Sequence, residues 1–382
     1  MPETDPMGAA SAPPSDPARA SHPALDPDGI RRLRDRLLDF FDARARSLPW
    51  RETGDPYAIW VSEIMLQQTR VETVVPYWTA WMETFPTVHD LAAADEETVL
   101  KAWEGLGYYS RARNLHEAAR VVRERWEGRV PDTRDDLRTL PGIGAYTAGA
   151  VASIAFDRSV PAVDGNVRRV VARLLDWPDP RAAALEAEVA RWVPAERPGD
   201  FNQALMELGA TVCTPRTPSC GSCPVADGCR ARRAGTVGER PASRRRVEVP
   251  RVHHGVAVAI RSFDEGIRMA LRRRPDGGML AGLWEFPAME VEDPDGVEAA
   301  VAALVGADPA DGEPLAPVPH AFSHLHVTYH PVLVRVGPGG AAPAGSRWLG
   351  PDELRDLPLP VAQQRIAEGA RRALGLDPEE TR

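Results

Sequence analysis

All four cysteines of this 382-residue chain lie within residues 213–229. They are Cys213, Cys220, Cys223 and Cys229, in the spacing C-x6-C-x2-C-x5-C. Four thiols so close in sequence are typical of a metal site rather than of a disulfide framework. Tetrahedral sets of thiolates bind zinc or an iron–sulfur cluster, and the spacing alone leaves both open. The chain must therefore fold so that one short loop gathers four sulfur atoms.

The composition is that of an ordinary globular protein with more than one core, since 43% of the residues are hydrophobic and 26% are charged. The longest apolar runs are too short to span a bilayer, so we expect no membrane contact. The N-terminus lacks a basic start followed by an apolar block, so no secretory signal is expected. We expect a cytoplasmic monomer.

The first two thirds of the chain predict an all-α domain. Residues 1–27 are rich in Pro, Ala, Ser and Asp and predict a disordered tail. Within residues 28–235, apolar residues recur at helical spacing, beginning with Ile30, Leu33 and Leu37. We expect helix breaks at seven prolines: Pro49, Pro76, Pro86, Pro131, Pro141, Pro161 and Pro194.

The last third predicts a separate α+β domain at 251–376, joined by a linker at 236–250. A β-hairpin is expected from 255–260 and 267–271, which flank an Asp-Glu-Gly turn. Further strands are expected at 283–287, 322–329 and 331–336, and helices at 295–305 and 360–374. The expected architecture is thus an α-helical domain followed by an α+β domain.

The net charge of −9 does not exclude nucleic acid, because the charge is unevenly distributed. A strip after the last cysteine opposes many arginines to only Glu239 and Glu248. Its arginines are Arg230, Arg232, Arg233, Arg240, Arg244, Arg245, Arg246 and Arg251. This strip is either a solvated linker or a surface for polyanions.

The segment Leu140-Pro141-Gly142-Ile143-Gly144 stands between two helical patterns. Two glycines around one apolar residue make a tight turn that leaves backbone N–H groups exposed at the start of the next helix. Such a turn suits a phosphate, or it serves only to join two helices.

Two carboxylates are candidates for chemistry. Glu63 lies in an apolar helical stretch, where it is either costly or on a wet face. Asp164 precedes another helical run and could be simply its N-cap. If both face one cleft, an apolar setting would favour a protonated Glu63 and hydrogen bonds would keep Asp164 ionised. An acid paired with an anion is what cleavage of a glycosidic bond requires.

Taken together, these segments resemble the adenine DNA glycosylase family, which belongs with endonuclease III to the helix-hairpin-helix superfamily. The resemblance covers residues 30–374 and rests on seven motifs in order. They are Leu48–Arg51, Ser62–Thr69, Gly105–Arg113, Leu140–Gly144, Val163–Val167, Phe201–Ala204 and the cysteine spacing.

The resemblance implies a 4Fe–4S cluster on the four cysteines and a basic loop that meets the DNA backbone. It implies that Glu63 protonates adenine at N7 and that Asp164 stabilises the sugar cation and forms a transient covalent link. Asn166 and Tyr146 would position these groups. Gln68 and Tyr108 would enter the base stack while adenine is extruded; otherwise they are a surface amide and a core tyrosine. Arg51 would touch either the base or only the fold, and Gly142 and Gly144 would bind a DNA phosphate.

Position 146 separates this family from relatives that also nick DNA. Those enzymes carry a Schiff-base lysine two residues after the second hairpin glycine, where this chain has Tyr146. The only lysine, Lys101, is distant in sequence. We therefore expect a monofunctional glycosylase without strand cleavage.

The C-terminal domain resembles a Nudix hydrolase at 277–287. The helix that should carry its magnesium-binding carboxylates, at 296–305, has one glutamate, so we expect no pyrophosphatase activity. By resemblance, Phe322, Ser323 and His324 read the opposite base, 8-oxoguanine; otherwise Phe322 is a core aromatic and His324 a strand histidine.

These observations predict an enzyme of base excision repair that removes adenine mispaired with 8-oxoguanine or guanine in duplex DNA of the nucleoid. The alternatives are an endonuclease III-like pyrimidine glycosylase, a Nudix hydrolase acting on free nucleotides, and a non-catalytic iron–sulfur protein that binds DNA.

Overall fold

The computed structural model describes residues 24–242, 248–306 and 312–376. The expectations for residues 1–23 and for Arg244, Arg245 and Arg246 lie outside these ranges. The chain forms two compact units, which are described separately below. Unit 1 comprises Met1–Ser47, Asp132–Arg134 and Gly144–Arg244, and unit 2 comprises Leu48–Pro131, Asp135–Ile143 and Arg245–Arg382. In the described ranges, no helix combines the length and the apolar character that a membrane span needs.

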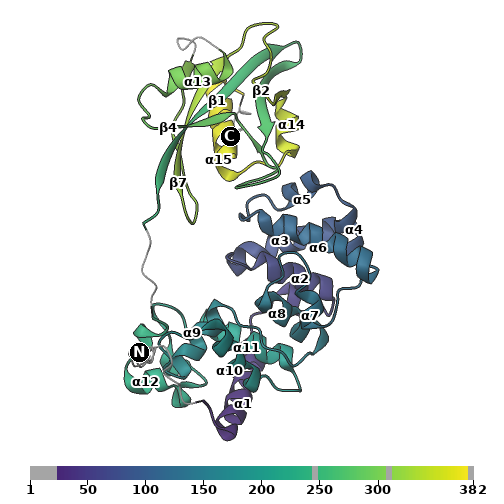
Figure 1. Cartoon of the computed structure of the whole chain (residues 1–382), viewed down its shortest axis with the longest axis vertical. Coiled ribbons are helices and arrows are strands. Elements are labelled where there is room, and N and C mark those ends of the chain that lie inside the picture. The colour runs from purple at the N-terminus through teal and green to yellow at the C-terminus, as the bar shows by residue number, and fades with distance from the viewer. Residues whose placement is uncertain (1–23, 243–247, 307–311, 377–382) are drawn as a thin grey trace, which may run out of the picture. The chain divides into compact units, whose positions relative to one another are not determined.

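Unit 1 is helical around one core (Figure 1). Its helices are α1 (Pro27–Arg44), α8 (Ala145–Phe156), α9 (Gly165–Leu174), α10 (Ala182–Trp192), α11 (Pro198–Thr211) and α12 (Arg230–Ala234). Short 3-10 turns follow the cysteines: η3 (Cys220–Ser222), η4 (Ala226–Gly228) and η5 (Val237–Glu239). The expected period at the N-terminus is confirmed, because Ile30, Leu33 and Leu37 of α1 are buried in this core.

The N-terminal part of unit 2 is also helical. It contains η2 (Pro49–Arg51), α2 (Pro56–Met65), α3 (Val71–Thr84), α4 (Val88–Ala93), α5 (Glu96–Ala102) and α6 (Ser110–Trp126), and α7 (Arg134–Leu137) spans the boundary between the units. Among the described residues up to 242 no strand occurs, which agrees with the expected all-α class.

One of the expected helix breaks is wrong. Pro76 lies inside α3, whereas the other six prolines begin or separate helices. Pro76 is exposed and only the sixth residue of the helix, so its missing N–H costs one hydrogen bond near the start. The burial of Val74 and Trp81 on the other face holds the helix together across it.

The C-terminal part of unit 2 is an eight-stranded mixed sheet. Its strands are β1 (Arg251–Phe263), β2 (Gly266–Arg273), β3 (Trp284–Glu285), β4 (Ala288–Val291), β5 (Gly312–Pro314), β6 (Val318–Ala321), β7 (His326–Arg335) and β8 (Ser346–Leu349). The order is β3-β2-β1-β7-β5, while β4 pairs with β1, β6 with β7 and β8 with β2. The expected hairpin is confirmed as β1 and β2, which close at Phe263 opposite Gly266.

Two expected strands, 322–329 and 331–336, are instead one. Strand β7 runs through Pro331, and residues 322–325 form the turn before it. Pro331 is tolerated because it lies where the antiparallel neighbour of β7 changes from β6, which ends opposite Tyr329, to β5, which begins opposite Val332.

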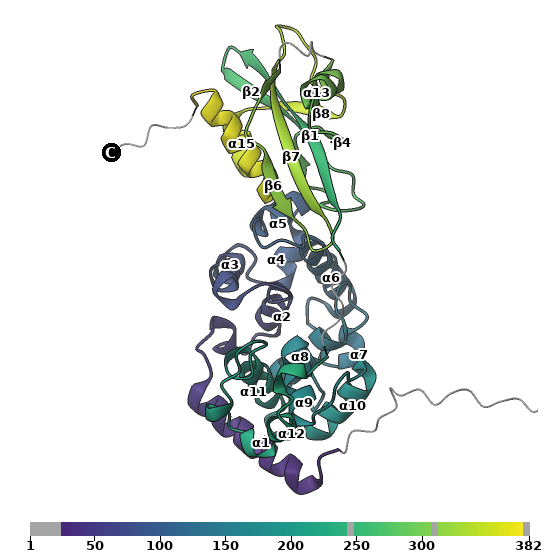
Figure 2. The same ribbon diagram turned by 90° about the vertical axis from the view of Figure 1, so that its left-hand side faces the viewer.

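Helices cover both faces of this sheet, as Figure 2 shows for α13 (Val297–Val305) and α15 (Val361–Ala373). Val256 and Val258 of β1 pack in the core that includes α15 and α14 (Pro351–Asp356), whereas Ala257 between them packs against α13. The alternation of side chains along β1 thus builds two cores from one strand.

Candidate functional site

Glu63 lies in the most buried helix of the unit 2 helical region. Every residue of α2 from Tyr57 to Met65 is buried, and Glu63 itself is 6% exposed. The alternative of a wet surface glutamate is therefore wrong. The helix begins at Asp55, whose carboxylate accepts a hydrogen bond from the N–H of Tyr57, and this cap fixes where the apolar run turns helical. The structure thus places a carboxyl group in apolar surroundings.

Asp164 is the N-cap of α9, in unit 1. Its Oδ1 accepts a hydrogen bond from the N–H of Val167 at 2.7 Å, and its Oδ2 accepts one from Nδ2 of Asn166 at 2.8 Å. Burial raises the pKa of Asp164 above its ordinary value, while these two hydrogen bonds and the charge of Arg169 hold the pKa down. Asp164 is therefore a helix cap, but a buried one whose carboxylate has polar partners on both oxygens.

Arg169, which the sequence analysis missed, joins this cap to the cysteine loop. Its Nη2 donates to Oδ1 of Asn166 and to the carbonyl of Gly209, both at 2.8 Å, and its Nε donates to the carbonyl of Cys213 at 2.8 Å. Helix α11 approaches closely here, since a Cβ on Gly209 would lie 2.6 Å from the Cβ of Asn166. The only sequence signal was a basic residue three positions after Asn166, on the same face of α9.

Tyr146 lies in the first turn of α8, also in unit 1. Its hydroxyl donates to the sulfur of Met206 at 3.6 Å. Position 146 therefore presents a phenol at the start of the helix that follows the hairpin.

The four cysteines surround one small hollow with Arg173, and all are half-buried. Among the described residues, no three Cys, His, Asp or Glu side chains are grouped as a single-ion site would require. A hollow ringed by four separate thiols suits a multinuclear cluster better than one ion. Burial raises the pKa of Cys223 to about 11, so its thiolate needs adjacent positive charge. Arg173 is 3% exposed, and its Nη1 lies 3.4 Å from Sγ of Cys213.

The hairpin forms the expected tight turn. Gly142 has φ +74°, and a Cβ there would lie 2.6 Å from the Cβ of Asn114, so only glycine fits. Gly144 caps α8 without a side-chain hydrogen bond, which leaves the first N–H groups of the helix without a side-chain acceptor. Arg51 lies half-buried in the 3-10 turn η2.

Gln68 and Tyr108 are both exposed on left-handed backbone, with φ 59° and 47°. Tyr108 is 44% exposed, so the alternative of a core tyrosine is wrong. Non-glycine residues adopt this conformation only where the surroundings hold it. Both side chains are thus presented to solvent from strained turns.

Phe322, Ser323 and His324 form the turn between β6 and β7. Ser323 and His324 are exposed, so His324 is not a strand histidine, whereas Phe322 is half-buried with its ring 4.5 Å from that of His320. Together with Tyr108, the three residues line one pocket of about 410 + 220 Å³, that is 630 Å³, within unit 2. Sequence reasoning named these residues separately and did not predict that they share a pocket.

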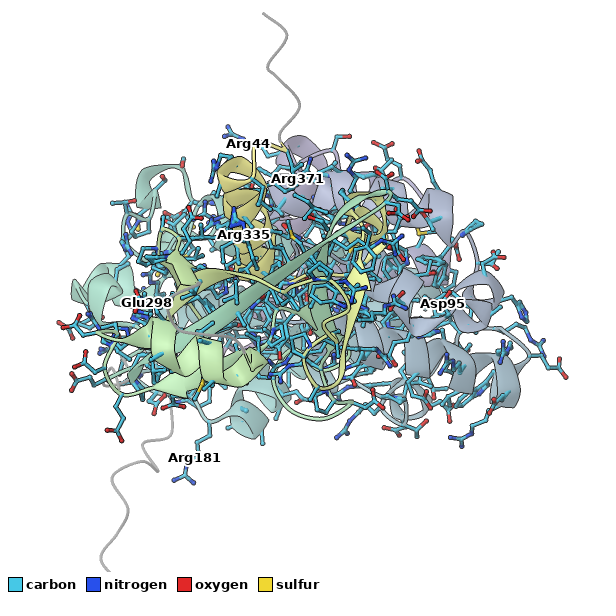
Figure 3. All side chains as sticks on the ribbon, turned by 90° about the horizontal axis from the view of Figure 1, so that it is seen from above. Arg44, Asp95, Arg181, Glu298, Arg335 and Arg371 are labelled. Carbon is cyan, nitrogen blue, oxygen red and sulfur yellow. The ribbon has the colours of Figure 1, made fainter. Side chains whose placement is uncertain are left out.

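The sheet domain carries no carboxylate cluster within its described residues. Helix α13 has one glutamate, Glu298, in its first turn (labelled in Figure 3). Buried Glu285 is neutralised by Arg272 and Arg274. Lys101, the only lysine, pairs with Glu104 at 2.7 Å and donates to the carbonyl of Leu357 at 3.2 Å.

Three family models match the chain. The model of the HhH-GPD superfamily of base excision DNA repair proteins matches residues 61–195, that of the iron-sulfur binding domain of endonuclease III matches 213–229, and that of the NUDIX domain matches 256–369. The expected domain types are thereby confirmed. Among solved structures, a thermostable thymine-DNA glycosylase is 31% identical with a TM-score of 0.51, over 54% of this chain and 97% of that one.

Curated relatives share more of the length. The adenine DNA glycosylase of Mus musculus is 37% identical, over 90% of this chain and 79% of its own. That of Homo sapiens is 37% identical over 88% and 73%, and that of Mycolicibacterium smegmatis 50% identical over 52% and 69%. The chain therefore belongs to the adenine DNA glycosylase family, as a DNA-repair N-glycosylase that carries a 4Fe–4S cluster.

Proposed function

We propose that this glycosylase excises adenine mispaired with 8-oxoguanine or guanine and leaves an intact strand with an abasic site. The pocket shared by Tyr108 and by Phe322, Ser323 and His324 is the observation that carries the mispair preference. It brings a side chain suited to enter the base stack next to polar groups suited to read a base edge. We propose a monomer that acts on nucleoid DNA in the cytoplasm.

In this proposal Glu63 is the general acid that protonates adenine at N7, and Asp164 is the anion that stabilises the sugar cation and forms the transient covalent link. The burial of Glu63 supports the first role, because an apolar setting favours a protonated carboxyl group. The hydrogen bonds to Asp164 support the second, because N–H donors favour the anion. Asn166 positions Asp164 directly, and Tyr146 is assigned a positioning role beside them.

The remaining contacts with DNA follow from exposed or uncapped groups. Gln68 and Tyr108 enter the stack while adenine is extruded, since a duplex hides the glycosidic bond. The backbone N–H groups after Gly142 and Gly144 bind a phosphate. Arg51 supports the turn before α2.

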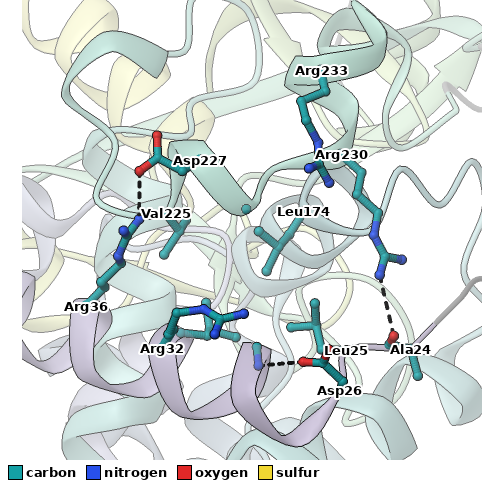
Figure 4. A pocket seen from close by; sticks show the side chains of 13 residues that line it. Ala24, Leu25, Asp26, Arg32, Arg36, Leu174, Val225, Asp227, Arg230 and Arg233 are labelled. Carbon is teal, nitrogen blue, oxygen red and sulfur yellow. Dashed lines mark hydrogen bonds and ion pairs between the residues drawn. The ribbon is translucent and has the colours of Figure 1, made fainter.

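The cluster, held by Cys213, Cys220, Cys223 and Cys229, supplies a fixed anchor for the loop that leads into the arginine strip. Arg230 and Arg233 of this strip line a pocket of 410 Å³ in unit 1 together with Arg32 and Arg36 of α1 (Figure 4). Asp227 pairs with Arg36 and Asp26 caps α1. We assign these arginines to contacts with the DNA backbone, whose phosphates they suit.

The absence of strand cleavage rests on the lack of an amine nucleophile. Position 146 holds a tyrosine, and Lys101 is engaged by Glu104 and by the carbonyl of Leu357. A Schiff base would require a free amine beside the sugar.

The deciding experiment is single-turnover base release from duplexes that contain adenine opposite 8-oxoguanine, adenine opposite guanine, or an oxidised pyrimidine opposite guanine. Each is analysed with and without alkali. Adenine release that appears as a break only after alkali supports the proposal. Release of the pyrimidine favours an endonuclease III-like activity, breaks without alkali contradict the monofunctional mechanism, and no release at all favours a protein that only binds DNA.

Variants of the turn test the reading of the opposite base. Ser323→Ala and His324→Ala should each lower release opposite 8-oxoguanine by about 3- to 10-fold, the value of one hydrogen bond, and leave release opposite guanine nearly unchanged. Ser262→Ala, on an exposed position of β1, is the matched control. Equal losses opposite both bases would contradict the role of this turn.

A further inference from the structure

Arg111, in the first turn of α6, is a buried arginine that is bound almost entirely by backbone. It is 8% exposed, and among the described residues no carboxylate pairs with it. Its two terminal nitrogens contact six oxygen atoms. Nη1 donates to the carbonyls of Ile64 (3.0 Å), Met65 (2.8 Å) and Gln67 (2.6 Å), and Nη2 to Oγ1 of Thr69 (3.1 Å) and the carbonyls of Leu106 (3.0 Å) and Gly107 (3.1 Å).

The fold accepts a cost for this arrangement. Burial lowers the pKa of Arg111 to about 10, which still leaves the guanidinium charged at neutral pH. Its Nε is buried without a hydrogen-bond partner in the described structure. A buried cation without a counter-ion is expensive, so a position that retains one calls for an explanation beyond packing.

Two of the acceptors directly precede the strained residues that present side chains to solvent. The carbonyl of Gln67 comes just before Gln68, at φ 59°, and the carbonyl of Gly107 just before Tyr108, at φ 47°. The guanidinium also lies 5.6 Å from the ring centroid of Tyr108. One side chain therefore holds both left-handed turns, and neither turn can relax without losing a hydrogen bond to it.

Two other acceptors close the helix that carries Glu63. The carbonyls of Ile64 and Met65 belong to the last turn of α2, where no N–H of the same helix follows to bond them. A cation at this negative helix end is favourable. The three parts that Arg111 contacts are thus the end of the Glu63 helix, the Gln68 turn and the Tyr108 turn.

We propose that Arg111 is a positioning residue that sets Gln68, Tyr108 and the end of the Glu63 helix in one fixed geometry before DNA binds. The role of the two turns in base extrusion rests on the function proposed above, whereas their coupling through Arg111 does not. Arginine is required because its planar fork offers donors in two directions, whereas a lysine ammonium offers three donors from one point.

The coupling is tested by amide hydrogen exchange in the cluster-loaded protein without DNA. Arg111→Lys should speed exchange about tenfold or more in both turns, at residues 64–70 and 105–110, and leave unit 1 unchanged. Arg123→Lys, in the same helix, is the control and should change neither turn. Faster exchange in one turn only, or in neither, would overturn the proposal.

A milder variant covers the case in which Arg111→Lys does not fold. Thr69→Val removes one acceptor next to the Gln68 turn and leaves the guanidinium in place. If Arg111 couples the turns, exchange should also rise at residues 105–110, on the other side of the guanidinium. Unchanged exchange there overturns the coupling.

Base release provides a second measurement. Arg111→Lys should slow release of adenine that is paired opposite 8-oxoguanine much more than release of adenine opposite an abasic site, where less unpairing is needed. Equal slowing on both duplexes would mean a general structural role and would contradict the proposal. If the unaltered protein releases no adenine from either duplex, the proposed function fails while the exchange result still decides the role of Arg111.

Discussion

The two carboxylates proposed for catalysis lie in opposite surroundings. Glu63 is in the middle of a helix that is buried from Tyr57 to Met65, whereas Asp164 stands at the start of a helix, where Val167 and Asn166 donate to its oxygens. Burial favours the neutral acid and N–H donors favour the anion. The difference teaches how one chemical group can serve two roles, because its neighbours decide which protonation state is stable.

Asp164 also shows that a position can belong to both classes. It is a hydrogen-bonded N-cap, yet its burial outweighs its donors and raises its pKa. Asp95, the N-cap of α5, has the same pair of acceptor oxygens but is exposed, and the N–H and hydroxyl of Thr98 lower its pKa (Figure 3). The cap motif alone therefore does not determine the charge of an aspartate; its burial does.

The largest effect is expected from Glu63→Gln. The amide nearly preserves the shape of the side chain but carries no proton to donate, so single-turnover release of adenine should fall by about 10³-fold or more. Binding to the mispaired duplex should be retained, as measured by titration. Glu72→Gln, on an exposed position of α3, is the control. Turnover equal to that of the unaltered enzyme would remove Glu63 from its role.

A smaller loss is expected from Asp164→Asn. Asparagine still caps α9, so the fold should be preserved, but the negative charge next to the sugar is lost. Single-turnover release should fall by about 10²-fold. Asp95→Asn changes a cap of the same type away from the proposed chemistry and should leave the rate unchanged. A rate loss shared by both variants would show that Asp164 acts only as a cap.

Much of this molecule could be predicted from sequence. The helical period of α1, the β1–β2 hairpin and the cap at Asp164 follow from local patterns and were found. Pro76 and Pro331 were misjudged because packing across a helix and a change of strand partner are decided by residues far away in the chain. Local propensity gives only a weak preference that such contacts override.

The candidate site was predicted as residue types but not as an arrangement. Arg169 and Arg111 are ordinary basic residues in amphipathic helices, and no local signal distinguishes them from the surface arginines around them. Their partners are mostly backbone carbonyls, and a carbonyl has the same sequence signature at every position. Networks built on backbone acceptors are therefore visible only in the folded chain.

The pH dependence of base release sharpens the comparison of the carboxylates. The ionised form of Asp164 is the active one, so the rate should fall about tenfold per pH unit below its pKa. Since burial raises this pKa, the acid limb should lie at higher pH than for an exposed aspartate. The residual rate of Asp164→Asn should lack this limb. A limb unchanged in that variant would assign the titration to another group.

The smallest effect concerns stability and compares the two caps. Because the folded-state pKa of Asp164 is raised, the stability from this group is fully present below the ordinary aspartate pKa of about 3.9 and is lost as pH rises through the raised value. Asp164→Asn should therefore gain in relative stability as pH rises. For Asp95 the sign is reversed: its pKa is lowered, so its contribution is present above the ordinary value and is lost as pH falls through the lowered one. Asp95→Asn should thus lose relative stability at neutral pH and recover it in acid. Denaturant unfolding of both variants at pH 4 and pH 7 measures the difference, which should not exceed about 1 kcal/mol because asparagine keeps each cap. Shifts of the same sign in both variants would show that the cap, and not burial, governs these aspartates.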